Sequence, residues 1–175
     1  MEFKATFRIG AKEASDFYIY QALHTRYIGV ISFGLLGALI CYLFCGSIIP
    51  SQALLIAASV LAFFLAASIT IFFIIVSVQV KVKLAMKKNN TGDYDQTIEI
   101  NGFGVRTEAN DKDVRINFEK IKSVRETKTA FYIYLNKDHA WILPKEQLKN
   151  PEEDCSVIRK IFDTVIPSKQ LHFMK

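Results

Sequence analysis

A long stretch in the middle of the chain is apolar and carries no charge. No Asp, Glu, Lys or Arg occurs among the 54 residues from position 27 to position 80. Within it, residues 28–49 and 53–78 are each long enough, at about 1.5 Å per residue, to cross a hydrocarbon layer of about 30 Å. The residues between them are few and uncharged. We therefore predict two transmembrane helices joined by a short turn as an antiparallel hairpin, which occupies residues 28–80.

The segment before the hairpin shows two periodicities in turn. Apolar residues alternate with polar ones from Phe3 to Ile9, as in a strand with one buried face. Over residues 12–27 the aromatic positions follow helical spacing and lead into the first apolar segment. Residues 1–27 are thus predicted to form a strand and an amphipathic helix. The strand should pair with a sheet formed later in the chain, because an isolated strand leaves its backbone groups unpaired.

The segment after the hairpin begins as a helix and then becomes β-rich. Helical spacing continues to about residue 88, where Asn89-Asn90-Thr91-Gly92 is a helix-ending sequence with Gly92 as a C-cap. Alternation then predicts strands at 97–100, 105–108, 114–118, 122–127, 131–135 and 140–143. Asn101-Gly102 is typical of a tight hairpin turn. Further turns are expected at 110–111, 128–129 and 136–138.

The last predicted element is a helix over about residues 151–166. Its apolar positions share one face, and these are Cys155, Ile158, Ile161, Phe162 and Val165. The predicted fold class is therefore an α+β membrane protein, with a two-helix transmembrane hairpin and a small antiparallel sheet domain at 81–175. From residue 93 onward we expect a curved sheet of at least five antiparallel strands, closed by the C-terminal helix.

The distribution of basic residues predicts the orientation of the hairpin. Arg8, Lys12 and Arg26 precede the first apolar segment, and the turn between the two segments has no base. Four lysines follow the second segment: Lys81, Lys83, Lys87 and Lys88. The positive-inside rule places both ends in the cytoplasm. We expect Arg26 and the four lysines to contact the membrane surface, as general anchors rather than as a site for one lipid. A cleaved signal peptide does not fit, because the first segment is too long and a second follows.

Small residues recur at four-residue spacing in both apolar segments. Gly34 and Ala38 lie in the first, and Ala58, Ala62 and Ala66 lie in the second. Such rows allow close approach of helix backbones in lipid. They predict either a homodimer contact or packing within the hairpin, and we favour the second. The absence of Asp, Glu, Lys, Arg and His from both segments argues against a proton relay, a coupled transporter or a voltage sensor.

The sequence offers no residue set for catalysis or for a cofactor. It lacks a glycine-rich phosphate loop and a nucleophile elbow, and its three histidines are far apart in the chain. Cys41 and Cys45 share a helix face, but no histidine or acid accompanies them as a metal ligand. We therefore predict no catalytic, cofactor-binding or metal-binding residues and no enzyme activity. From residue 81 onward 18 bases alternate with 14 acids, which does not favour nucleic acid as a partner.

Several blocks of the C-terminal segment resemble a known family. They are Ile98 to Val105, Phe118 to Val124, Phe131 to Leu135 and Trp141 to Lys145. The chain resembles the YcxB-like proteins of bacteria, and its C-terminal part is similar to bacterial pleckstrin-homology-like domains. The resemblance implies an architecture and no catalytic residues. It suggests a protein of the bacterial inner membrane that presents a pleckstrin-homology-like domain to a protein partner or a lipid. A small oligomeric pore, an accessory subunit of a membrane complex and an immunity-like protector remain alternatives.

Overall fold

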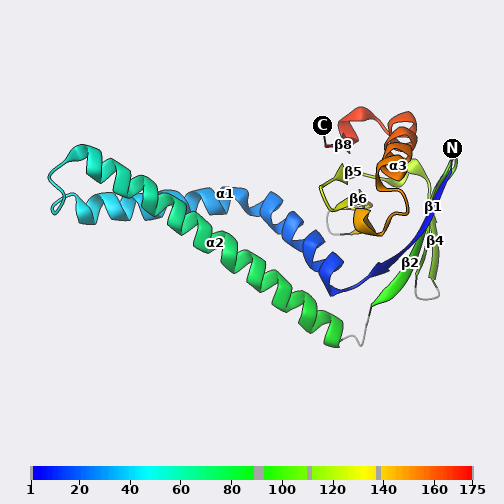
Figure 1. Cartoon of the computed structure of the whole chain (residues 1–175), viewed down its shortest axis with the longest axis horizontal. Coiled ribbons are helices and arrows are strands. Elements are labelled where there is room, and N and C mark those ends of the chain that lie inside the picture. The colour runs from blue at the N-terminus through cyan, green and yellow to red at the C-terminus, as the bar shows by residue number, and fades with distance from the viewer. Residues whose placement is uncertain (1, 89–92, 110–111, 137–138, 175) are drawn as a thin grey trace. The chain divides into compact units, whose positions relative to one another are not determined.

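The chain forms two compact units. The structure is a computed structural model that describes residues 2–88, 93–109, 112–136 and 139–174 (Figure 1). One unit, here called the sheet unit, combines Met1–Ala14 with Met86–Lys175. The other, the hairpin unit, is Ser15–Ala85. The first strand is thus separated in sequence from the rest of the unit in which it folds.

Two helices supply the hairpin unit. α1 spans Ala11–Cys45 and α2 spans Gln52–Lys88. The predicted amphipathic helix and first apolar segment form the single helix α1, which ends at Cys45 rather than at Ile49. The backbone N–H groups of Ile48 and Ile49 both bond the carbonyl of Cys45, which forms a turn after the last helical residue. The predicted helix-ending sequence at residues 89–92, with Gly92 as its cap, lies outside the described residues.

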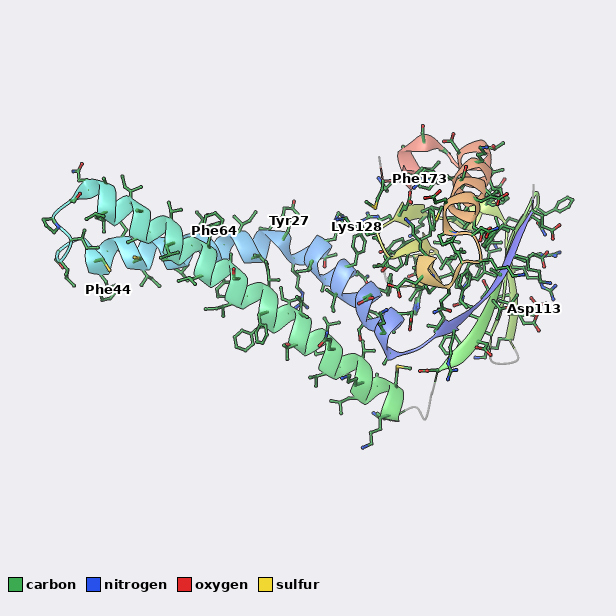
Figure 2. The ribbon with its side chains drawn as sticks, in the orientation of Figure 1. Tyr27, Phe44, Phe64, Asp113, Lys128 and Phe173 are labelled. Carbon is green, nitrogen blue, oxygen red and sulfur yellow. The ribbon has the colours of Figure 1, made fainter. Side chains whose placement is uncertain are left out.

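Both helices are long and apolar enough to span a membrane. In the most apolar stretch of α1 only 6% of the residues are buried, and in that of α2 none is buried. Large side chains therefore point outward along both helices, as Tyr27, Phe44 and Phe64 do in Figure 2. Phe44 is 74% exposed and Phe64 is 61% exposed. An apolar surface of this extent is rare on a protein that is fully surrounded by water.

Glycines of α1 mark where the two helices touch. A Cβ added at Gly34 would lie 2.6 Å from the Phe63 ring. A Cβ added at Gly37 would lie 2.8 Å from the Cβ of Ala66 and 3.3 Å from the carbonyl oxygen of Ala62. Gly34, Ala62 and Ala66 thus lie at the contact between α1 and α2. Gly37 contributes as well and is not among the predicted residues. Ala38 and Ala58 are half-buried.

Replacing Gly37 by leucine is expected to destabilise the hairpin by about 1–3 kcal/mol, because the new side chain has no space against α2. Thermal unfolding of the detergent-solubilised chain, followed by helical circular dichroism, measures the effect. Gly29→Leu is the matched control, because a Cβ at Gly29 meets nothing within 4 Å. Equal behaviour of the two variants would contradict the helix contact described here.

The sheet unit begins with an antiparallel sheet of four strands. In spatial order these are β1 (Phe3–Ile9), β2 (Tyr94–Asn101), β3 (Gly104–Ala109) and β4 (Lys112–Ile116). Phe3 lies opposite Ile100, which confirms that the N-terminal strand pairs with the later sheet. Asn101 lies opposite Gly104, so Gly102 and Phe103 form a two-residue turn, one residue later than the predicted Asn101-Gly102 turn. Gly104 has φ +152°, a value that L side chains rarely adopt.

A second sheet follows instead of a continuation of the first. Its spatial order is β7 (Ala140–Pro144), β6 (Ala130–Tyr134), β5 (Ser123–Glu126) and β8 (Leu171–His172), with β8 parallel to β5. The α+β class is confirmed, but the structure has two sheets where one curved sheet is predicted. The cause is a 3₁₀ turn, η1 (Phe118–Lys120), after which β5 pairs with β6 rather than with β4. The predicted turns at 110–111 and 137–138 lie outside the described residues.

One helix and the buried faces of the two sheets provide the core of this unit. α3 spans Pro151–Val165 and buries Ile158 and Phe162 completely. Four of the five predicted face positions of α3 are buried, but Val165 is 37% exposed because it lies at the end of the helix. The sheets add fully buried side chains, among them Phe7, Ile98, Val105, Phe131, Ile133 and Leu143.

Candidate functional site

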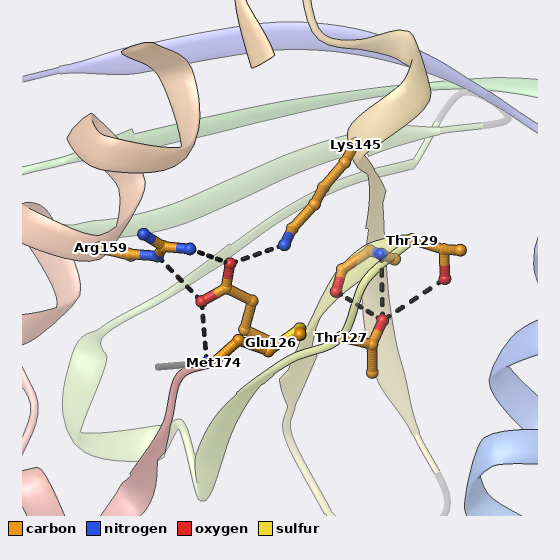
Figure 3. Close-up of polar contacts among 7 residues, drawn as sticks. Glu126, Thr127, Thr129, Lys145, Arg159 and Met174 are labelled. Carbon is orange, nitrogen blue, oxygen red and sulfur yellow. Dashed lines mark hydrogen bonds and ion pairs between the residues drawn. The ribbon is translucent and has the colours of Figure 1, made fainter. Parts of the chain in front are cut away.

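A buried carboxylate joins three elements of the sheet unit (Figure 3). The side chain of Glu126, on β5, is fully buried. Its Oε1 accepts hydrogen bonds from Lys145 Nζ at 2.6 Å and from Arg159 Nη2 at 2.5 Å. Its Oε2 accepts from Arg159 Nε at 2.9 Å and from the backbone N–H of Met174 at 3.2 Å. We call Glu126, Lys145, Arg159 and Met174 the Glu126 cluster.

The charges of the Glu126 cluster favour a structural role. Burial by itself would raise the pKa of Glu126, but the hydrogen bonds from Arg159 and Lys145 outweigh it and the net pKa is lowered. The carboxylate therefore stays ionised at neutral pH, so it has no proton to donate there and its low pKa makes it a weak base. Burial also raises the pKa of the neighbouring Cys155. That side chain remains a thiol, which is a poor nucleophile.

A different feature of the sheet unit has unused hydrogen-bonding capacity: the edge of β1. The side chain of Gln147, in η2 (Lys145–Gln147), binds this edge at Arg8. Gln147 Oε1 accepts from the Arg8 N–H at 2.7 Å, and Gln147 Nε2 donates to the Arg8 carbonyl at 2.9 Å. The side-chain amide thus pairs with Arg8 as a residue of a neighbouring strand would.

The register shows which other groups of β1 point to the same side. In an antiparallel sheet, the backbone groups of successive residues point alternately toward one neighbour and the other. Arg8 points away from β2, so Lys4 and Thr6 do too. The tight turn between Asn101 and Gly104 gives the same assignment, because it makes the odd-numbered residues of β2 bond β3 and leaves the even-numbered ones to bond β1. Two N–H and two C=O groups therefore lie on the free edge of β1.

A groove of about 580 Å³ runs beside this free edge. One wall is Glu2 together with β1 from Phe3 to Thr6, and the other is the segment from the end of η2 to the first turns of α3. That second wall consists of Gln147, Lys149, Asn150, Glu153, Asp154 and Val157. We call this feature the β1 groove. Both walls belong to the sheet unit, so the groove is a property of a single compact body.

The residues predicted to contact a membrane surface lie elsewhere. Arg26 is on α1, and Lys81, Lys83, Lys87 and Lys88 are on the last turns of α2. All five side chains are exposed. The sequence contains no pattern that marks Glu126, Arg159 or Gln147 as residues of a site. Glu126 and Arg159 are 33 residues apart in the chain, and Arg8 and Gln147 are 139 residues apart. No local sequence pattern therefore indicates these contacts.

Comparison with known proteins supports the resemblance seen in the sequence. The model of the YcxB-like protein family matches residues 100–154. The matched segment runs from the end of β2 into α3 and includes Glu126, Lys145 and Gln147. The resemblance to this family is thus confirmed over residues 100–154. No curated protein and no solved structure matches the chain.

Proposed function

We propose that the protein is a membrane-anchored interaction module, in which α1 and α2 cross the cell membrane and the sheet unit binds a protein partner. The observation that supports this most directly is the exposed apolar surface of the two helices. In the most apolar stretch of α2 no residue is buried. Lipid chains are the solvent in which such a surface is stable, and within a helix the backbone groups are already hydrogen-bonded.

The proposed location of the sheet unit is the cytoplasmic face. Bases occur at the ends of α1 and α2 that adjoin this unit, and the residues between the two helices include none. The lysines after the second apolar segment would then lie next to anionic headgroups, where each attracts them by about 1 kcal/mol. The chain from Tyr94 onward would be held within reach of the inner leaflet.

Binding, rather than catalysis, is the role that we propose for the sheet unit. Every hydrogen-bonding position of the Glu126 carboxylate is used in holding the fold together. The two sheets and α3 fit the pleckstrin-homology-like arrangement that the sequence resemblance implies. What the unit offers to a partner is a groove next to unpaired backbone groups.

Washing membranes at alkaline pH tests the anchoring. We expect the chain to remain in the membrane pellet after washes with high salt and with sodium carbonate at high pH, and to enter solution only with detergent. Salt removes proteins held by charge alone, because screening shortens electrostatic reach to about 3 Å at 1 M. Release of the chain by salt or by carbonate would contradict the proposal.

A further inference from the structure

We propose that the β1 groove binds an extended protein segment, which adds to the sheet as a fifth strand beside β1. The inference rests on the proposed function in one respect, because it supplies the partner-binding site of the interaction module. The supporting observation is different, however: the backbone groups of Lys4 and Thr6 on the outer edge of β1 have no partner among the described residues, and a groove lies beside them. Strand addition satisfies such groups and is a common mode of peptide recognition.

The free edge defines the register of the added strand. In antiparallel pairing, one residue of the segment exchanges two hydrogen bonds with Lys4, and the residue two positions away exchanges two with Thr6. Gln147 already occupies the next such position, at Arg8. The added strand therefore cannot continue past Thr6 in that direction, and any further length must extend beyond Glu2.

The walls of the groove define the side chains that fit. Residues of the segment that lie opposite Phe3 and Ala5 point to the same side of the sheet as those two, which is the side of α3. The charged residues that line this wall are two acids, Glu153 and Asp154, and one base, Lys149, and Val157 adds an apolar surface. The described part of α3 has three acids in its first turn and no base there. Positions on this side should thus be basic or apolar.

The occupant we infer is therefore an extended segment with lysine or arginine at alternating positions and no proline among the pairing residues. Proline is excluded because it lacks the N–H that a carbonyl of Lys4 or Thr6 would accept. Residues between the basic and apolar positions point to the outer face of the sheet and can be polar. Threonine suits them, because it favours strands.

A defined peptide serves as the probe. Its seven residues are, in order, threonine, lysine, threonine, valine, threonine, lysine and threonine. The full chain in detergent micelles is titrated with this labelled peptide, and binding is followed by fluorescence anisotropy. Amide hydrogen exchange is measured on the same complex. We expect saturable binding and at least tenfold slower exchange of the Lys4 and Thr6 amides, with no change at Asp113 or Arg115 on the opposite edge strand, β4.

Thr6→Pro should lower the affinity for the peptide at least tenfold. The N–H that this change removes points away from β2, and proline is tolerated at such edge positions, so the pairing with β2 is retained. Arg115→Pro is the matched control. By the same alternation Arg115 points away from β3 on the other free edge of this sheet, so the peptide affinity should stay within twofold.

Two modified peptides test the inference without any change to the protein. N-methylation of the threonines that pair with Lys4 and Thr6 should abolish binding, because it removes the backbone donors. Replacement of both lysines by glutamate should weaken binding at least tenfold. Equal binding of the N-methylated peptide, or unchanged binding by Thr6→Pro, would overturn strand addition at β1.

Two other occupants are outcomes that would also overturn the inference. If the Lys4 and Thr6 amides are protected by dimerisation in the absence of peptide, the groove is an interface between two copies of the chain. If they are protected only by vesicles of anionic lipid, the groove is a headgroup site. Neither result affects the carbonate wash, so failure of this inference and failure of the membrane anchor are distinguishable.

Discussion

Replacing Glu126 by glutamine is expected to lower the free energy of unfolding of the sheet unit by about 3 kcal/mol. The change removes the negative charge from a fully buried position and leaves Lys145 and Arg159 facing a neutral amide. Removing one partner of a buried ion pair typically costs about 3–5 kcal/mol. We expect the lower end because the Arg159 side chain is 43% exposed and can be solvated in part.

Trp141 is a convenient probe for this measurement. It is the only tryptophan in the sequence, and it lies in β7 next to β6, so its fluorescence reports on the sheet unit. Urea unfolding of the detergent-solubilised chain gives the free energy for wild type and variant. Glu119→Gln is the matched control. Glu119 is exposed on η1, and its loss should change stability by less than about 0.5 kcal/mol.

Acid should remove the difference between wild type and Glu126→Gln. The folded protein holds the pKa of Glu126 below its ordinary value of 4.5. A lowered pKa means that the contribution of the carboxylate is fully present above pH 4.5 and is lost as the pH falls through the folded-state pKa. Protonated Glu126 is then nearly isosteric with glutamine. If the two proteins differ as much at low pH as at pH 7, the loss of charge is not what destabilises the variant.

The tail of the chain should respond to the same substitution. Met174 bonds the Glu126 carboxylate, and β8 pairs with β5 over only two residues. Both contacts are next to position 126. Loss of the carboxylate should therefore increase hydrogen exchange in Leu171 and His172 before the rest of the sheet unfolds.

Features that depend on neighbouring residues were predictable from the sequence. The uncharged stretch identifies the two long helices, because a water-exposed helix needs charges on its outer face. The alternation from Phe3 to Ile9 identifies β1, and Asn101-Gly102 locates the turn between β2 and β3 to within one residue. In each case the signal lies in residues that are consecutive in the chain, so it does not depend on contacts between distant segments.

Features that depend on distant residues were not predictable in this way. In the sequence, Glu126 interrupts a series of bases near Lys122 and Arg125 and gives no sign of burial. Its ion-pair partners lie 19 and 33 residues further along the chain. β8 has two residues and no alternation to detect. The division into two sheets depends on the turn at η1 (Phe118–Lys120), after which β5 pairs with β6. The local pattern indicates where strands lie but not which strands pair.

The hairpin is expected to insert in one orientation, with the ends of α1 and α2 that adjoin the sheet unit in the cytoplasm. The bases that flank α1 and α2 are all on the side of the sheet unit, so translocation of that unit would carry them across the membrane. Replacement of Lys81, Lys83, Lys87 and Lys88 by glutamine should weaken the preference without removing the anchor. A mixed population of orientations is expected for that variant.

A reporter enzyme that is active only outside the cytoplasm measures this orientation directly. The reporter is fused in one chain after Ser51, between the two helices, and in another after Lys175. We predict high activity for the fusion at Ser51 and background activity for the fusion at Lys175. Activity at Lys175 with silence at Ser51 would contradict the account, because the sheet unit and its β1 groove would then face away from the cytoplasm.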